Sequence, residues 1–157
     1  TSDHGYHLGE HTFWQKSNLH EEVTRGPLVI SLPGLKPGRS KSLVELVDLF
    51  PTLSRLAGLQ APKGLHGTSL LPILRDPAAR VKESALSIHG SGTSMRTANW
   101  TYTRYKDGSE ELYDMENDPG QFTNRARDTE SAKTLAGQRK AFEKRLGAAG
   151  LKPARVR

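Results

Sequence analysis

The sequence contains no cysteine. This absence excludes a disulfide framework and any metal site built on thiolates, and it leaves the redox compartment of the protein open. Long apolar runs are also missing. No stretch approaches the roughly 18 residues needed to cross a bilayer, so no membrane span is predicted. The chemistry of the chain must therefore come from carboxylates, imidazoles, amines and hydroxyls.

At 157 residues the chain has the length of about one domain and is long enough to bury a core. Lys and Arg total 23 against 17 Asp and Glu, which gives a net charge of +6. Such a balance favours anionic partners, for example phosphate, sulfate, acidic glycans or nucleic acid. Part of the excess, Lys152, Arg155 and Arg157, lies in a proline-containing tail that we expect to be solvated.

The first sixteen residues have the composition of a reaction centre. They combine acidic residues, three histidines and a lysine with glycines and aromatic side chains. Asp3 and His4 are adjacent, and a tight turn at Gly5 would let an oxygen and a nitrogen face one cation. Lys16 adds a positive charge on a flexible stem.

Two other interpretations of this segment stay open. Residues 7–11 match the H-x-x-E-H zinc pattern, in which a helix presents two histidines with a catalytic glutamate between them. Gly9 lies inside that pattern and is a poor helix former. Alternatively, the histidines are ordinary loop residues and Phe13 and Trp14 are anchored in the core. This alternative explains the joint presence of Asp3, His4 and Lys16 less well.

The middle of the chain predicts short elements. The apolar run 28–32 is typical of a buried parallel strand, and residues 42–47 fit either a strand or a helix. Asp48 has the place of an N-cap for a helix that Gly58 would end, and a second short helix is predicted over 70–74. The apolar face of the first helix would consist of Leu49, Leu53, Leu56 and Ala57.

The second half predicts an antiparallel sheet covered by a helix. Strand-like segments occupy residues 85–89, 94–98, 100–105 and 111–115, and Asp107-Gly108 marks the turn between the last two. A helix over 130–146 would cover the sheet with Leu135, Phe142 and Leu146. Polar residues alternate along the third strand, which predicts that one face of the sheet is wet. The alternating sets are Thr101, Thr103 and Tyr105 on one side and Tyr102, Arg104 and Lys106 on the other.

Several motifs occur in the order and spacing of one enzyme family. They are Ser2-Asp3-His4-Gly5, Leu8-Gly9-Glu10-His11, Trp14-x-Lys16, the segments 24–30, 47–53 and 56–58, Gly67-x-Ser69-Leu70-Leu71-Pro72, Arg96-Thr97, Glu111-Leu112-Tyr113-Asp114 and Asn117-Asp118-Pro119. They cover roughly residues 1 to 125 and resemble the sulfatase family, within the alkaline-phosphatase-like superfamily, most closely its iduronate-2-sulfatase-like branch.

The resemblance implies an α/β fold class: the C-terminal part of an alkaline-phosphatase-like sandwich, plus a small antiparallel sheet with a C-terminal helix. Residues 1–80 would belong to the α/β domain and carry the metal and sulfate loop. Residues 81–150 would form the small subdomain, and residues 151–157 a basic tail. Members of the family are periplasmic, extracellular or lysosomal, and the sequence itself assigns no compartment.

By the same resemblance, Asp3 and His4 match the later pair of ligands for a divalent cation, usually calcium, and Lys16 matches a lysine that contacts a sulfate oxygen. Both the cation and the ammonium would stabilise negative charge on the sulfate in the transition state. From ligand chemistry alone the nitrogen of His4 suggests zinc or manganese instead, because calcium prefers oxygen ligands. The resemblance implies Ca²⁺.

The chain departs from the family because it lacks the C-x-P-S-R or S-x-P-S-R segment, whose first residue becomes the formylglycine nucleophile. The earlier metal ligands also have no counterpart before Thr1. We therefore expect the chain to be the C-terminal fragment of a longer sulfatase, with the N-terminal part of the same enzyme as its partner, and to be inactive alone. Gly26, where a β-branched residue usually precedes the proline, is a smaller departure.

The substrate implied by the resemblance is a sulfated small molecule or glycan. Candidate substrate-binding residues are His11, Tyr6, Trp14, His89 and Arg96, with His7 as a further residue at the rim of a sugar pocket. A phosphonate or phosphodiester hydrolase of the same superfamily is an alternative, because sulfate and phosphate need similar clamps. A second alternative is a basic, non-catalytic module that binds polyanions through the aromatic hairpin of residues 100–105. For the sulfatase we expect neither a nucleic acid partner nor a membrane span.

Overall fold

The computed structural model describes residues 1–151. The chain forms two compact units. One consists of Thr1–Leu28 together with the chain from Leu86 onward, and the other of Val29–Ala85. Residues 152–157, which make up most of the predicted basic tail, lie outside the described residues. The assignment of residues 1–80 and 81–150 to two domains stays a prediction.

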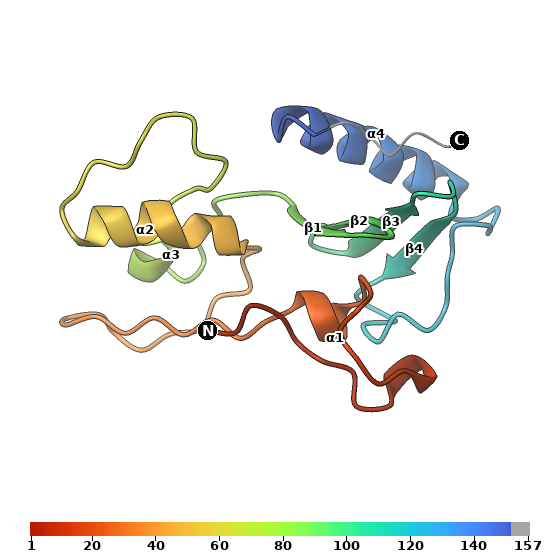
Figure 1. Cartoon of the computed structure of the whole chain (residues 1–157), viewed down its shortest axis with the longest axis horizontal. Coiled ribbons are helices and arrows are strands. Elements are labelled where there is room, and N and C mark those ends of the chain that lie inside the picture. The colour runs from red at the N-terminus through yellow and green to blue at the C-terminus, as the bar shows by residue number, and fades with distance from the viewer. Residues whose placement is uncertain (152–157) are drawn as a thin grey trace. The chain divides into compact units, whose positions relative to one another are not determined.

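The first unit contains a four-stranded antiparallel sheet, with the strands in sequence order (Figure 1). Its strands are β1 (Ala85–His89), β2 (Gly92–Arg96), β3 (Trp100–Tyr105) and β4 (Glu110–Asp114). The turn between β3 and β4 contains Gly108 at a φ of 86°, a conformation that glycine adopts without a steric penalty. The predicted sheet and its turn are therefore confirmed, with strand ends shifted by at most two residues at β2 and one at β4.

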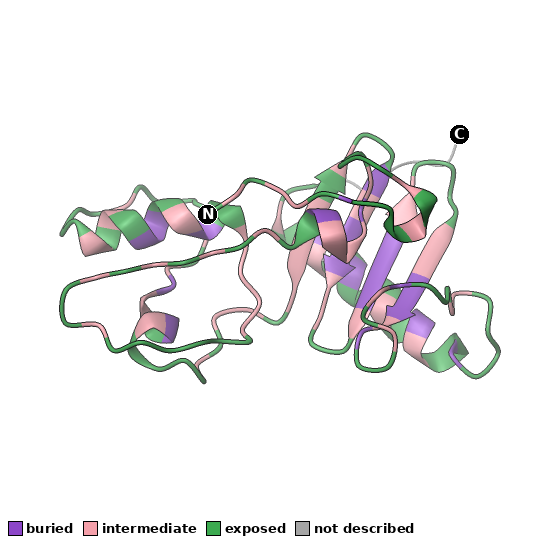
Figure 2. Cartoon of the chain, turned by 90° about the horizontal axis from the view of Figure 1, so that it is seen from below, coloured by how far each residue is buried: buried purple, intermediate pink, exposed green. Residues whose placement is uncertain are grey.

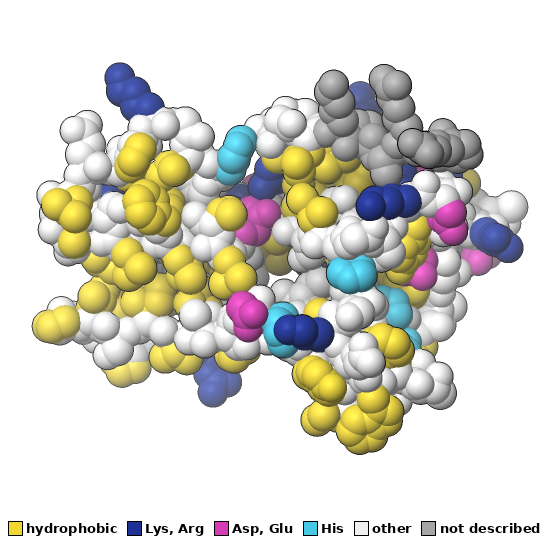
Figure 3. Space-filling view, in the orientation of Figure 1, with side chains coloured by type: hydrophobic (Ala, Val, Ile, Leu, Met, Phe, Trp, Pro, Cys, Tyr) yellow, Lys and Arg dark blue, Asp and Glu magenta, His cyan; other side chains and the backbone are white. Residues whose placement is uncertain are grey.

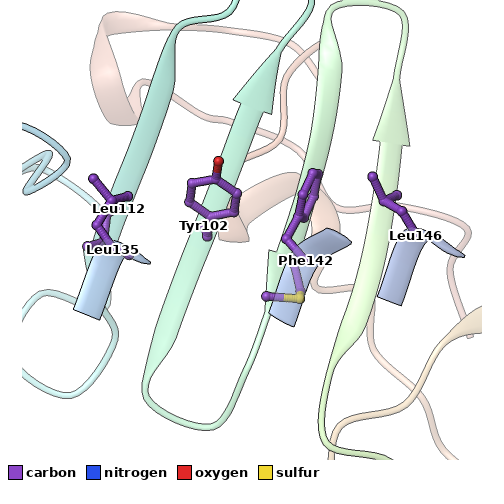
Figure 4. Packing of buried hydrophobic residues seen from close by; sticks show 6 residues of the cluster. Tyr102, Leu112, Leu135, Phe142 and Leu146 are labelled. Carbon is purple, nitrogen blue, oxygen red and sulfur yellow. The ribbon is translucent and has the colours of Figure 1, made fainter. Parts of the chain in front are cut away.

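Helix α4 (Ala132–Ala148) covers one face of the sheet and forms the main core with it (Figure 1, Figure 4). The register aligns Met95 with Tyr102 and Tyr102 with Leu112 across three strands, so these side chains share one face. The cluster consists of Met95, Tyr102, Leu112, Leu135, Phe142 and Leu146, all buried. The predicted packing of this helix on the sheet is confirmed.

The alternation predicted that the opposite face of the sheet is exposed to solvent, and this prediction is wrong. Thr101 is 3% exposed and Thr103 is 1% exposed. The N-terminal segment, including α1 (Glu21–Thr24), lies against this face (Figure 1). Glu21 pairs with Arg96 of β2 at 3.4 Å. The polar side of the strands would be exposed only if no other segment covered it. In this structure the N-terminal segment, about 80 residues earlier in the chain, covers it.

The second unit is built around a short helix pair. Helix α2 (Leu49–Leu56) follows the 3-10 turn Leu46–Asp48, and α3 (Leu71–Arg75) begins after Leu70. Asp48 directly precedes α2 as predicted, but its buried carboxylate does not cap that helix. It accepts hydrogen bonds from the backbone N–H of Glu45 (2.8 Å) and Thr68 (2.7 Å) and pairs with Lys82. Asp48 therefore ties two loops together.

The prediction of a strand over residues 28–32 is wrong. Residues 28–32 do not form a strand, and Val29 is 82% exposed, because no strand among the described residues pairs with this run. The expected apolar face of α2 is only partly covered, since Leu49 and Leu56 are half-buried and Ala57 is exposed. Pro51 and Thr52 are the buried residues of the helix, while Leu53 is 61% exposed. Figures 2 and 3 show how much of α2 and its apolar side chains is exposed.

Within residues 1–151, no helix combines the length and apolar character that a bilayer crossing requires.

A network of charged residues borders the core. Glu110 accepts hydrogen bonds from Tyr102 Oη and from Arg139, whose Nε lies 2.9 Å from Glu110 Oε1. The Arg139 guanidinium holds the pKa of Glu110 below its ordinary value, burial opposes this effect, and the Tyr102 hydroxyl adds to it. The ionised carboxylate is thus the form that the fold stabilises.

This lowered pKa predicts how stability depends on pH. A carboxyl group whose pKa is lower in the folded than in the unfolded chain contributes stability above its unfolded pKa, and the contribution is lost as the pH falls. Urea unfolding should therefore show that Glu110→Gln lowers the free energy of unfolding at pH 7 but no longer does so well below pH 4.5. The matched substitution Glu116→Gln, at an exposed position, should have little effect at either pH. An equal loss for Glu110→Gln at both pH values would contradict this interpretation.

Candidate functional site

The N-terminal loop is attached to α1 through a close backbone approach at Gly5. The Gly5 N–H donates to Val23 O at 2.8 Å, and the Ser2 N–H donates to Pro27 O at 3.3 Å. A Cβ atom on residue 5 would lie 1.9 Å from Glu22 O, a distance that no side chain can accept without movement of the backbone. Glycine at position 5 is therefore what allows the chain that carries Asp3 and His4 to run against α1.

The loop then folds back on itself and returns to His4. The His7 N–H donates to Gln15 O at 3.0 Å, and the Gly9 N–H donates to Phe13 O at 3.2 Å. Gly9 has a φ of 126°, which only glycine adopts readily. This hairpin-like turn, with the 3-10 segment Glu10–Thr12 at its tip, explains how Lys16 lies beside a residue twelve positions earlier.

Asp3, His4 and Lys16 lie together at the surface of this unit. Lys16 Nζ is 2.7 Å from His4 Nε2, and Asp3 Oδ2 is 3.7 Å from the same nitrogen. The Asp3 side chain is 81% exposed and that of His4 is 31% exposed. The sequence prediction that these three groups gather at one place agrees with the structure, while their chemical roles stay a prediction.

The arrangement of His4 suits it to face a cation. His4 Nδ1 lies 2.6 Å from Gly5 O, and because a carbonyl only accepts, Nδ1 carries the proton. Nε2 therefore has a free lone pair, which accepts a hydrogen bond from the Lys16 ammonium. The ammonium of Lys16 thus faces this nitrogen, and the carboxylate of Asp3 lies beside it. The donor set fits a divalent cation held by Asp3 and His4, with Lys16 next to it.

The candidate substrate-binding residues are scattered over different environments. Tyr6 and Trp14 are 51% and 63% exposed. His89 Nδ1 interacts with Ser91 Oγ at 2.9 Å, and Arg96 pairs with Glu21. His11 is largely buried and stacks on the ring of Phe122 at 4.8 Å. Their contact with a substrate stays a prediction, and in this structure the side chains of His89 and Arg96 interact with other protein groups.

The interpretation of residues 7–11 as a helix that presents two zinc-binding histidines is wrong. No α-helix forms there, since the segment is a turn in which His11 has a φ of 54°. The rim position expected for His7 is also wrong, because His7 is 0% exposed. It lies in a group with His11, His20 and Glu22 that the sequence reasoning missed. The only sign of this group in the sequence was the high number of histidines near the N-terminus. Its membership could not be predicted, because only the fold brings Glu22 and His20 close to His7.

The comparisons with known proteins agree in pointing to one family. The family model described as N-sulphoglucosamine sulphohydrolase, C-terminal, matches residues 9–146. Arylsulfatase K of Xenopus laevis is 34% identical over an alignment of 142 residues, and the match covers 79% of this chain and 26% of that protein. Choline-sulfatase of Rhizobium meliloti is 33% identical over 132 residues, covering 80% of this chain and 26% of that protein.

Solved structures show the same likeness. The structure of BT4656 in complex with its substrate D-glucosamine-2-N,6-O-disulfate is 26% identical to this chain, with a TM-score of 0.86, and the match covers 92% of this chain and 33% of that one. BT1596, a 2-O GAG sulfatase, is 29% identical with a TM-score of 0.78 and a coverage of 92% and 34%.

The chain spans about a quarter of the length of the curated relatives it matches. The predicted partial coverage of a longer enzyme therefore agrees with the matches. The relatives do not test the expected closeness to the iduronate-2-sulfatase-like branch, which stays a prediction.

The close approach at residue 5 yields a prediction about stability. Gly5→Ala would place a methyl group against the carbonyl of Glu22, so the loop must move, and we expect a loss of about 1–3 kcal/mol in the free energy of unfolding. Gly90→Ala is the matched control, because a Cβ there meets nothing within 4 Å. Urea denaturation of both variants checks this, and an equal effect of the two substitutions would contradict the close approach.

Proposed function

The chain belongs to the sulfatase family, and we propose that it is the C-terminal part of an enzyme that hydrolyses sulfate esters. The observation that carries the proposal is the meeting of Asp3, His4 and Lys16 at one surface position, with 2.7 Å between the ammonium and the imidazole. A carboxylate, an unprotonated imidazole nitrogen and an ammonium form a set that can bind both a cation and an anion.

In this proposal Asp3 and His4 hold a divalent cation, which we take to be Ca²⁺ from the resemblance to the family. When bound, such a cation polarises the sulfate oxygens as a Lewis acid. The hydrogen bond from His4 Nδ1 to the carbonyl of Gly5 keeps the ring oriented and its other nitrogen available.

Lys16 contacts a sulfate oxygen in the proposed enzyme. Its ammonium lies on the exposed side of His4, on a long and flexible side chain. A charge-assisted hydrogen bond from this group would offset the negative charge that grows on the sulfate oxygens as the ester bond breaks. The ammonium can leave His4 Nε2 for the sulfate, because its stem turns freely at the surface.

The nucleophile of the proposed reaction is not in this chain. The sequence has no cysteine and no S-x-P-S-R segment from which a formylglycine could be made. We therefore propose that the N-terminal part of the same enzyme supplies the nucleophile and the remaining metal ligands. The exposed apolar side chains of the second unit support such a partner, since Val29, Phe50 and Leu53 are each more than half exposed.

The proposed substrate is a sulfated sugar. The support comes from the relatives, since BT4656 was solved with a disulfated glucosamine and BT1596 is a 2-O GAG sulfatase. The relatives named above are sulfatases, which favours a sulfate ester over the phosphonate or phosphodiester alternative and over a non-catalytic polyanion-binding module.

Substitution in the full-length polypeptide that carries this sequence tests the proposal. Asp3→Asn, His4→Gln and Lys16→Ala should each lower kcat/KM for an aryl sulfate by about 10²–10³-fold, because each removes a group that stabilises charge in the transition state. Lys133→Ala, at an exposed position of α4, is the matched control and should leave turnover unchanged. The 157-residue chain alone should hydrolyse nothing.

Unchanged turnover in the Asp3 and His4 variants would refute the proposed roles. Preferential hydrolysis of a phosphonate monoester by the unsubstituted polypeptide would refute the sulfate ester as the substrate.

A further inference from the structure

Three histidines and a glutamate form a compact cluster between the N-terminal loop and α1. The ring centroids of His11 and His20 are 4.2 Å apart, and His7 lies 5.6 Å from His11 and 6.0 Å from His20. Glu22 reaches into the same group, with its Oε1 3.8 Å from His11 Nε2. His7 is fully buried, and the other three side chains are between 16% and 21% exposed.

The cluster contains four buried polar atoms that find no hydrogen-bond partner among the described residues. They are His7 Nδ1, His11 Nε2, His20 Nδ1 and Glu22 Oε2. Buried polar groups are nearly always satisfied in folded proteins, because leaving them unpaired is costly. Four such atoms within one group of side chains therefore indicate that something binds between them.

One of the two contacts between Asn18 and His7 would leave His7 Nδ1 available to a ligand. The amide of Asn18 contacts His7 Nε2, with Oδ1 at 3.1 Å and Nδ2 at 2.8 Å, and Oδ1 also accepts from the backbone N–H of His20 at 3.2 Å. A proton on His7 Nε2 would be accepted by this oxygen and would leave a lone pair on Nδ1. The carboxylate of Glu10 approaches His7 Nδ1 only to 4.0 Å and already accepts from the N–H of Leu8.

The carboxylate of Glu111 lies near His20. Glu111 Oε2 is 3.8 Å from His20 Nε2 and accepts a hydrogen bond from Tyr105 Oη at 2.9 Å. Metal-binding histidines commonly have a carboxylate on the side of the ring away from the metal, and Glu111 lies near that position at 3.8 Å, without a hydrogen bond to His20.

We propose that His7, His20 and Glu22 bind one Zn²⁺ ion, with His11 as the fourth ligand. One nitrogen or oxygen atom from each of His7, His20 and Glu22 lies within 4.8 Å of the others. Imidazole nitrogens with one carboxylate oxygen suit zinc, whereas calcium prefers shells of oxygen alone. The proposal does not rest on the sulfatase activity, and its residues are distinct from Asp3 and His4.

The zinc would serve as a structural cross-link. His7 comes from the hairpin-like turn that leads to Lys16, while His20 and Glu22 lie at the start of α1. Four protein ligands leave no open position for a substrate, which is typical of structural rather than catalytic zinc. The ion would therefore fix the loop that carries Lys16 to the helix against which Asp3 and His4 lie.

The metal content of the full-length polypeptide tests this proposal. The protein is purified without a polyhistidine tag, dialysed against buffer with a trace of Zn²⁺ and then without it, and analysed by mass spectrometry for metals. We expect one zinc per chain, lost in His20→Gln and in Glu22→Gln. His66→Gln and His89→Gln, which alter histidines outside the cluster, and Asp3→Asn should all retain it. Replacement of zinc by Co²⁺ should give the intense visible absorption of a tetrahedral site.

Stability provides a second readout. Removal of zinc by a chelator should lower Tm by roughly 5–10 °C in the unsubstituted protein and in His66→Gln, but hardly at all in Glu22→Gln. Should the cluster variants fail to fold, the zinc content and cobalt spectrum of the unsubstituted protein still decide. Absence of zinc from that protein, retention of zinc by both cluster variants, or its loss in Asp3→Asn would each overturn the proposal.

Discussion

The close approach of Gly5 to the backbone of Glu22 is the constraint on which the candidate site depends. A side chain at position 5 would collide with the carbonyl of Glu22, so only glycine lets the two segments run together. The hydrogen bond from Gly5 to Val23 then fixes Asp3 and His4 on one side of α1. The turn of residues 7–15 brings Lys16 back to the same place. The backbone of the loop, more than contacts of the side chains themselves, thus brings Asp3, His4 and Lys16 together.

The sheet explains why this loop is held in position. One face of the strands is apolar and packs against α4, whereas the other presents Arg96 and Glu111 to the N-terminal segment. These charged groups pair with Glu21 and His20, so the polar face of the sheet acts as a platform for the loop. The same platform supports the histidine cluster. The small sheet and the site therefore form one structural unit, even though they lie far apart in the sequence.

The sequence predicted the elements whose signals are local. The alternating side chains and the Asp107-Gly108 turn predicted β3 and β4. The spacing of Leu135, Phe142 and Leu146 predicted α4. The meeting of Asp3, His4 and Lys16 was also foreseen, from the family motifs. The covered polar face was not, because it depends on long-range pairs such as the bond from Glu21 N–H to the side chain of Gln121, 100 residues away. The apolar run 28–32 misled for the same reason, since a strand needs a partner as well as a pattern.

A crystal structure of the full-length polypeptide with Ca²⁺ and sulfate would test the proposed site most directly. The proposal predicts a cation about 2.3–2.6 Å from an Asp3 carboxylate oxygen, with the Nε2 of His4 also in its coordination shell. Lys16 Nζ should then lie within hydrogen-bond distance of a sulfate oxygen instead of His4. A cation bound elsewhere, with Lys16 still hydrogen-bonded to the imidazole of His4, would contradict it.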